Sequence, residues 1–528
     1  MAIALLICAS CVPLYFVAQA LLSPLRGIPG PFWARFTRLW KLLEIYRGRF
    51  EKTSIALHKK YGKRMSACSH KQSAETTISG PIVRIAPNEY SIDDPGAVKE
   101  IYGLGSQFIK SPWYTASSSP DPNAVKDLFS DRDVRTHASN RRKVASLYSM
   151  SNLVQMEPFV NDCTKLLEAK FTKFAEQGRP VDMGHWLQCY AFDVIGHITV
   201  CPSLLSQGRP EYLMPLQLGE RFGFLDNGED IGSIIAAVND YVSYAAHVGV
   251  YSELHGKINE LQSRFRQKGS GMANMVAFTR KQLQQRISDS IEKSLDRGDF
   301  ISKLLSLHKE DPKGISEGDI FTTCMTNIGA GSDTTSISLG SIVYYLCRHQ
   351  NAMHALREEI ATMEAKGEIS NPVTFAESQR MPYLQAVIKE ALRMHPATGL
   401  PLGRVVPPGG KVIAGCQLPE GTVVGINSWV AHANTAVFGD DASNFRPERW
   451  LDGKEKTASL DRYFFSFGMG SRTCIGKHIS LLEMSKLVPQ LIRNFDISLE
   501  NSHQTWRTTN RWFVKQSQYP CKLERRAN

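Results

Sequence analysis

The stretch Phe465–Gly476, with the sequence FSFGMGSRTCIG, surrounds a single cysteine with three glycines and an arginine. Because glycine lacks a Cβ, such a chain can turn tightly and approach a flat ligand closely. Apolar residues after Gly476 repeat at the spacing of one buried helical face, which predicts a helix just after Cys474. Unpaired N–H groups at a helix start favour an anionic sulfur, and the thiolate is the form that binds metal. The stretch therefore predicts a sulfur bonded to something large and flat.

The same loop has other interpretations. An inert cysteine in a glycine-rich turn is the commoner meaning of an isolated cysteine before a helix, and the loop alone leaves it open. Cys474 and His478 have the spacing of half a zinc site, but no second pair of ligands stands at such a spacing. A phosphate loop is excluded, because G-x-x-x-x-G-K-[ST] is absent and no glycine stretch completes G-x-G-x-x-G.

The pattern F-G-x-G-x-R-x-C-x-G, matched by Phe467–Gly476, resembles the haem-binding loop of cytochrome P-450 enzymes. The resemblance implies that Cys474 is the axial thiolate ligand of the iron in haem b. It also implies that Phe467 packs under the porphyrin near the sulfur and that Arg472 pairs with a haem propionate. A thiolate ligand pushes electron density toward the iron and favours O–O bond cleavage.

A second motif, IGAGSDTTS, occupies Ile328–Ser336 inside a long predicted helix. Gly329 and Gly331 each cost about 1 kcal/mol there relative to alanine, a cost that the close approach of a flat ligand would offset. Asp333 stands beside hydroxyl groups that can relay protons into an apolar site. The alternative is a helix–helix contact through small residues, with Asp333 on the surface.

The motif is similar to the family pattern A-G-x-[DE]-T-T. This resemblance places Ala330, Asp333 and Thr334 over the distal face of the haem. It implies that Thr334 hydrogen-bonds the bound dioxygen and helps to deliver protons.

Three charged residues recur in the family order before the cysteine loop. In IKEALRMHP, Glu390 and Arg393 are spaced i, i+3 on a helix, and FRPERW supplies Arg449. An exposed pair of this kind contributes only a few tenths of a kcal/mol. The resemblance to E-x-x-R and P-E-R implies instead that the three lock into a buried structural network.

Further cations resemble the family's propionate-binding positions. THASNRRKV brings His137 and Arg141 one helical turn apart, and PLGRVV contains Arg404. A basic solvated face is the alternative, and many family members carry tryptophan where this chain has His137. We also hypothesise that three cations form the face on which a reductase docks, namely Arg142, Lys143 and Lys477.

Composition narrows the class of protein. The chain has 528 residues, 42% of them hydrophobic, and a net charge of +11. No block of like charges or basic stripe with aromatic residues occurs, which argues against a nucleic-acid partner. The eleven cysteines are scattered without a CxxC pair, which fits a reducing compartment rather than a disulfide framework.

The N-terminus predicts a membrane anchor. Ala2–Leu22 contains no charge, and about 20 apolar residues span a bilayer as a helix. The Ala-Gln-Ala sequence at 18–20 resembles a signal-peptide cleavage site, but no basic residue precedes the run. Basic residues follow it closely, which keeps the downstream chain in the cytosol. We therefore predict a transmembrane anchor over 1–22, a proline-rich linker over 23–33, and an endoplasmic-reticulum membrane location.

The rest, 34–528, is predicted as one haem-thiolate monooxygenase domain, mainly α with small β-sheets (α+β). Strands are expected in Pro81–Ile92 and in Lys411–Asn427, the latter turning at Pro-Glu-Gly, and helices in Gln284–His308 and Ala352–Met363. The polar segment 63–79 is predicted to be a disordered insertion. It separates sequences that are adjacent in family members, so we hypothesise a retained intron, which sequencing of abundant message would test.

The resemblance implies a haem monooxygenase that inserts one atom of O2 into a lipophilic small molecule. Electrons would come from NADPH through a separate diflavin reductase, with cytochrome b5 as a further candidate donor. KSPWY, LYSMS and RWFVKQ look most like fungal members of secondary metabolism. A haem-thiolate isomerase or dehydratase that uses no O2, and a non-catalytic haem protein, remain the alternatives. The substrate is expected to contact Ser106–Asp127, Asn327–Ala330, Ala397–Leu402 and the turn near Thr505–Asn510.

Overall fold

The computed structural model describes Ala18 and residues 20–62, 80–119, 124–200, 222–265, 271–288, 298–503 and 505–526. The predicted insertion 63–79 and nearly all of the predicted anchor 1–22 lie outside these residues. Within the part of the chain that is described, no helix has both the length and the apolar character needed to cross a bilayer.

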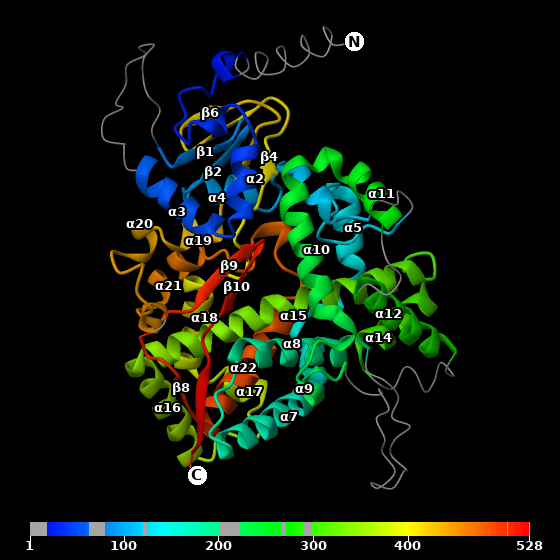
Figure 1. Ribbon diagram of the computed structural model, residues 1–528, viewed down its shortest axis with the longest axis vertical. Helices are drawn as coiled ribbons and strands as arrows, with labels where there is room; N and C mark the ends of the chain where they lie inside the picture. Colours follow the sequence, from blue (N-terminus) through cyan, green and yellow to red (C-terminus); the bar gives the residue numbers. More distant parts are fainter. Residues whose placement is uncertain are drawn as a thin grey trace.

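Helices dominate the described chain, and the longest, α15 (Glu317–Arg348), runs through the middle of the molecule (Figure 1). The helices nearest the site are α4 (Ala97–Tyr102), α5 (Val134–Val144), α8 (Met183–Val200), α18 (Pro382–Met394) and α22 (Lys477–Asn494). The others are α2 (Leu39–Tyr46), α3 (Phe50–Tyr61), α6 (Met150–Leu153), α7 (Glu157–Glu176), α9 (Phe224–Asn227), α10 (Ile234–Val248), α11 (His255–Phe265), α12 (Gly271–Ser288), α14 (Phe300–Glu310), α16 (Gln350–Ala365), α17 (Phe375–Ser378), α19 (Ser428–His432), α20 (Thr435–Phe438) and α21 (Lys454–Asp461).

In the described ranges, the strands form one five-stranded sheet and three two-stranded sheets. The larger sheet has the order β1-β2-β7-β4-β3, in which only β2 and β7 are parallel. Its strands are β1 (Ile82–Ala86), β2 (Glu89–Ile92), β3 (Ile109–Lys110), β4 (Arg404–Val405) and β7 (Val423–Gly425). The small sheets pair β5 (Lys411–Ile413) with β6 (Cys416–Leu418), β8 (Phe495–Leu499) with β11 (Cys521–Arg525), and β9 (Arg507–Arg511) with β10 (Phe513–Ser517). The fold is therefore mainly helical with small sheets, as predicted.

The expected strands are present, but one turn was predicted wrongly. Pro81–Ile92 forms the antiparallel β1–β2 hairpin. In Lys411–Asn427 the hairpin turn lies at Ala414 and Gly415, which both have positive φ angles, and not at Pro-Glu-Gly. The Pro-Glu-Gly segment instead carries the chain from β6 to β7, which joins the larger sheet. A turn-forming tripeptide does not specify whether its two strands pair with each other.

The helix predictions were right for Ala352–Met363, which lies within α16, and wrong for Gln284–His308. The latter region is not one helix, because α12 ends at Ser288 and α14 begins at Phe300. Gly298 has a φ of 73°, and the carboxylate of Asp299 caps α14 by accepting from the N–H of Ser302. The apolar pattern of α14 resembles a continuation of α12, but the Asp299 cap starts a separate helix at Phe300.

Two helices carry the motifs. Ser316 and Asp319 form a reciprocal capping box at the start of α15, as the sequence predicts. The helix after Cys474 is α22, whose predicted apolar face is buried. The hydroxyls of Thr335 on α15 and Ser480 on α22 lie 2.8 Å apart, so the two motif-bearing helices contact directly.

Candidate active site

The cysteine loop is shaped by backbone contacts that require glycine. The N–H of Cys474 donates to the carbonyl of Phe467 over 2.8 Å, which closes the loop. Gly468 and Gly470 have φ angles of 64° and 63°, which disfavour other residues. A Cβ at Gly470 would lie 1.7 Å from the carbonyl oxygen of Tyr102, so the end of α4 excludes any side chain there.

The sulfur of Cys474 has the surroundings of a ligand. The residue is exposed, whereas Cys163, Cys189, Cys324, Cys416 and Cys521 are buried. Enclosure by the fold raises the pKa of the Cys474 thiol, while the backbone N–H groups of Gly476 and Lys477 and the charge of Arg141 lower it. These donors stabilise an anion at the sulfur, which a bound metal would complete.

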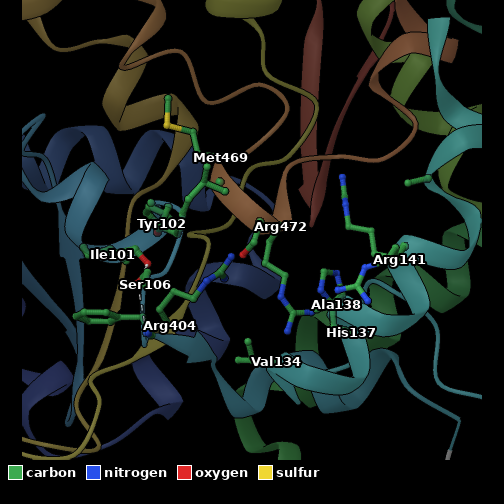
Figure 2. A pocket seen from close by; sticks show the side chains of 17 residues that line it. Ile101, Tyr102, Ser106, Val134, His137, Ala138, Arg141, Arg404, Met469 and Arg472 are labelled. Carbon is green, nitrogen blue, oxygen red and sulfur yellow. Dashed lines mark hydrogen bonds between the residues drawn. The ribbon is translucent and has the colours of Figure 1, made fainter. Parts of the chain in front are cut away.

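A cluster of cations lies beside this loop. His137 and Arg141 on α5, Arg404 on β4 and Arg472 in the loop all line a cavity of about 430 Å³. Figure 2 shows Arg472 between Arg404 on one side and His137 and Arg141 on the other. Within the described residues none of the three arginines has an ion-pair partner. The structure thus brings together all four predicted propionate-binding residues.

The positive charges in this cluster repel one another. Burial, followed by the charges of Arg472, Lys110, Arg141 and Arg404, lowers the pKa of His137 to about 3, so its imidazole is neutral at pH 7. Burial and Arg404 lower the pKa of Arg472 to about 10. Its guanidinium donates only to backbone carbonyls, those of Asp131 at 2.7 Å and Asp133 at 3.4 Å. Such a cluster fits a ligand with carboxylate groups, and haem with its two propionates is such a ligand.

The motif Ile328–Ser336 on α15 leaves one face of the helix exposed, called here the open face. Ala330 is exposed and Thr334, one turn later, is partly exposed. The hydroxyl of Thr334 donates to the carbonyl of Ala330 over 2.7 Å. A Cβ at Gly329 would meet no atom within 4 Å, so a ligand can approach the backbone closely at this turn.

Gly331 does not serve the role predicted for it. A Cβ at Gly331 would lie 2.9 Å from the Cγ1 atom of Ile195 on α8. This glycine therefore allows α8 and α15 to pack closely, which is the alternative that the sequence left open. Only Gly329 fits the close approach of a ligand.

Alanine substitutions at these two glycines should have opposite effects on stability. Gly329→Ala should raise the free energy of unfolding by about 1 kcal/mol, because alanine is the better helix former and no atom opposes it. Gly331→Ala should lower it by about 1–3 kcal/mol, because the methyl group overpacks the contact with Ile195. Chemical denaturation of both purified variants measures the difference. Equal midpoints would contradict the assignment.

Asp333 is buried rather than on the surface, and it points away from the open face. It is fully buried, and its Oδ1 accepts from Gln188 on α8 over 2.6 Å. Its Oδ2 lies 2.7 Å from Nζ of Lys515 on β10, and Lys515 is 30% exposed. No contact joins the side chains of Asp333 and Thr334 in the described structure, since neighbouring residues on a helix do not face each other. The Asp333–Lys515 pair instead connects the buried side of α15 with solvent.

The three residues predicted as a structural network meet in the core. Arg393 donates to both carboxylate oxygens of Glu390 at 2.8 Å, and Nε of Arg449 donates to Oε1 at 2.9 Å. All three are at most 2% exposed. Trp450 also donates to Glu390, and backbone carbonyls take up further N–H groups of the arginines. The carboxylate is thus paired on both oxygens.

A family model described as "Cytochrome P450" matches residues 31–524. The chain belongs to this family. A pisatin demethylase of Fusarium vanettenii is 36% identical over 506 residues, covering 95% of this chain and 89% of the relative. The cytochrome P450 monooxygenases cicH of Emericella nidulans and gsfF of Penicillium aethiopicum are 34% and 33% identical over 509 and 521 residues. These matches cover 95% and 96% of this chain and 94% and 95% of the relatives. The chain is thus a cytochrome P450 monooxygenase of fungal type, and the family implies a thiolate-ligated haem.

Regions expected to face the substrate of this P450 are only partly where the sequence placed them. The turn expected near Thr505–Asn510 lies two residues beyond that range, where β9 and β10 meet at Trp512, which has a φ of 83°. The ring of Trp512 lies 5.0 Å from Trp113 and 4.9 Å from Phe129. Ala397 and Gly399 pair through backbone hydrogen bonds with Val514 and Trp512. Nδ2 of Asn510 donates to the carbonyl of Gly399 over 3.1 Å, so two of the predicted regions are adjacent.

Sequence reasoning missed several residues of this P450 site. Lys110, Gln188, Lys515 and Trp512 lie outside the four family motifs, and no local pattern assigns them to the site. Tyr102 is a further one, since its hydroxyl donates to the carbonyl of Leu402 and accepts from the N–H of Ile426. Lys110 opens the KSPWY stretch, and Trp512 and Lys515 lie in RWFVKQ, but both stretches indicated only the family subgroup and no role at the site.

Proposed function

We propose that this P450 inserts one oxygen atom from O2 into a lipophilic small molecule of fungal secondary metabolism, with electrons from NADPH through a separate reductase. The observation that carries the proposal is the accessible Cys474 sulfur, held by N–H donors beside cations without carboxylate partners. Cys474 would bind the haem iron. Phe467 would pack beneath the porphyrin, and His137, Arg141, Arg404 and Arg472 would hold the propionates. Bound haem would supply the electron transfer and the oxygen activation.

Two residues of α15, Asp333 and Thr334, would take up protons and transfer them into the site. Thr334 offers a hydroxyl on the open face, next to the exposed Ala330. Asp333 accepts from Gln188 and pairs with Lys515, so a proton taken from solvent near Lys515 can be held at the Asp333 carboxylate. A rotation of Asp333 away from Lys515 would carry that proton toward Thr334.

Asp333→Asn should slow product formation by about 10²–10³-fold, because the amide cannot take up and release the proton. Thr334→Ala should instead let oxygen consumption continue while product falls, since the hydroxyl that directs the proton is missing. Product and oxygen consumption per NADPH oxidised measure both effects. Thr362→Ala, which removes an exposed helix hydroxyl of α16, is the control. An unchanged rate in Asp333→Asn together with unchanged coupling in Thr334→Ala would contradict the proposed proton path.

The electron donor would dock on the basic face formed by Arg142, Lys143 and Lys477. Arg142 is exposed and lines the same cavity as Arg141 and Arg472, while Lys143 and Lys477 are partly exposed. Acidic surfaces are attracted to such a face at low salt. The donor is a diflavin reductase, with cytochrome b5 as a second candidate.

The substrate would be apolar and at least partly aromatic. Trp512, Trp113 and Phe129 gather where two of the regions expected to face the substrate meet. Relatives named pisatin demethylase and cytochrome P450 monooxygenase support a small-molecule substrate by analogy. The uncharged Ala2–Leu22 run supports a single-pass anchor in the endoplasmic reticulum with the catalytic domain in the cytosol.

Coexpression with a fungal diflavin reductase tests the proposed function. The host extract is profiled for all new products, and NADPH-dependent oxygen uptake is measured on microsomes. Product with uptake supports the proposal. Product without oxygen uptake would establish the isomerase or dehydratase alternative, and haem binding without a substrate-induced spin shift across a library of lipophilic aromatic compounds would indicate a non-catalytic role.

A further inference from the structure

Two cysteine thiols from distant parts of the chain meet at the C-terminal end of α15. Cys347 is the second-last residue of α15, and its Sγ donates to the carbonyl of Ile497 on β8 over 3.5 Å. In the β8–β11 ladder Cys521 is the register partner of Leu499, two residues along from Ile497. Diagonal neighbours of this kind on one sheet face are within reach of each other. The thiols of Cys347 and Cys521 are accordingly hydrogen-bonded, although the residues are 174 positions apart.

The two cysteines differ in their access to solvent. Cys347 is partly exposed, whereas Cys521 has no exposed surface. The hydrogen bond with Cys347, followed by burial, raises the pKa of the Cys521 thiol, so this thiol stays protonated and does not react with oxidants in solution. Cys347 is therefore the sulfur that an oxidant meets first.

A guanidinium group lies near Cys347. Arg357 on α16 and Cys347 act on each other electrostatically. The Nη2 atom of Arg357 pairs with Asp496 at 2.7 Å, but its Nε atom is buried and has no hydrogen-bond partner among the described residues. A positive charge stabilises the thiolate that attacks a peroxide, and an unused N–H donor suits the oxygen that the sulfur then carries. A partly exposed cysteine beside a cation and a second thiol has the surroundings of a redox-responsive pair.

We propose that Cys347 is a site of reversible oxidation by hydrogen peroxide and that Cys521 is its resolving thiol. The Cys347 thiolate attacks one peroxide oxygen, the O–O bond breaks, and the departing hydroxide takes up a proton to leave as water. The resulting sulfenic acid is attacked at sulfur by Cys521, whose S–H proton leaves with the hydroxyl group as a second water. A disulfide forms, and peroxide has taken up the two electrons that the thiols lost. The disulfide joins the end of α15 to β11 until a cellular thiol reduces it.

The pair is remote from the haem-facing part of α15. Cys347 follows Thr334 by 13 residues, which places it about 20 Å further along the helix axis. The oxidation step needs neither substrate nor NADPH nor reductase. The proposed thiol chemistry therefore goes beyond the oxygenase reaction and does not depend on it.

Oxidation of the full-length holoprotein tests this proposal. The protein is treated with a few equivalents of hydrogen peroxide, quenched with catalase, alkylated and digested, and its peptides are analysed by mass spectrometry. We expect a pair of peptides linked through Cys347 and Cys521, which dithiothreitol separates. The apparent midpoint of thermal unfolding should rise by about 3–6 °C on oxidation, because the link closes a long loop of the unfolded chain.

Removal of the resolving thiol separates the two steps. In Cys521→Ser the sulfenic acid at Cys347 has no thiol to react with, so its labelling by dimedone should rise roughly tenfold over the wild type. Cys347→Ser should show neither the link nor a label on Cys521. Cys416→Ser changes another buried cysteine and should keep the link. If Cys521→Ser yields no folded holoprotein, Cys521→Ala takes its place, because alanine adds no polar group to the buried position.

Each possible result either supports or overturns the proposal. Absence of the link in the oxidised wild type would overturn it, and so would equal dimedone labelling of Cys347 in the wild type and in Cys521→Ser. A dimedone label on Cys521 in Cys347→Ser would overturn the roles given to the two thiols. Because all measurements are made without substrate, NADPH or reductase, they stand even if the proposed oxygenase reaction fails its own test.

Discussion

Cys474→Ser should abolish the red-shifted absorption band of the reduced, carbon-monoxide-treated protein and reduce product formation to below roughly one-hundredth of the wild-type rate. The estimate exceeds the 10–100-fold cost of losing an outer-shell partner, because here the ligand itself is lost. A serine hydroxyl stays neutral at pH 7 and donates little electron density to the iron. The N–H donors of Gly476 and Lys477 would then face an uncharged oxygen.

A matched cysteine variant shows whether this effect is specific. Cys416→Ser changes a buried cysteine on β6 and should keep the absorption band and most of the activity. Visible spectra of the reduced carbon-monoxide adducts and product formation with reductase are the measurements. Retention of the band in Cys474→Ser would mean that another residue ligates the iron, and the site described here would be wrong.

Glu390→Ala should lower the free energy of unfolding by about 3–5 kcal/mol, because it leaves Arg393 buried without a counter-charge and Arg449 with only the partly exposed Asp441. At an ordinary stability of about 5–15 kcal/mol, such a loss would leave little folded protein during expression. The yield of correctly ligated haem protein and the midpoint of chemical denaturation measure the effect. Glu100→Ala breaks the exposed pair with Lys411 and should cost at most about 1 kcal/mol. Similar midpoints for the two variants would contradict a buried network.

The same network gives stability a defined dependence on pH. Burial raises the pKa of Glu390, but hydrogen bonds and charges from Arg393 and Arg449 outweigh it and lower the pKa overall. A carboxyl whose pKa is depressed in the folded state stabilises the protein above its unfolded pKa, and this contribution is lost as pH falls through the folded pKa. Acid denaturation of Glu390→Ala should therefore lack part of the wild-type slope below about pH 4.5.

The sequence predicted the parts of the site that depend on residues close together along the chain. The cysteine loop, the capping box of Ser316 and Asp319 and the apolar face of α22 each depend on residues within a few turns of one another. Features that depend on distant partners were predicted only where the family resemblance supplied them, as for Glu390, Arg393 and Arg449. Gly331 looked like a ligand contact because Ile195 is 136 positions away. Lys110 could not be connected with Arg404, since strand register is set by the whole sheet.

Lys110 on β3 and Arg404 on β4 are register partners at the edge of the larger sheet, and both are only 5% exposed. These opposed cations have a consequence for how much enzyme a cell accumulates. A newly made chain that has not yet received its prosthetic group carries an uncompensated electrostatic strain there, and ligand binding to the native state relieves it. Iron and porphyrin supply would then set the abundance of this protein through its survival after synthesis, even where transcription is constant.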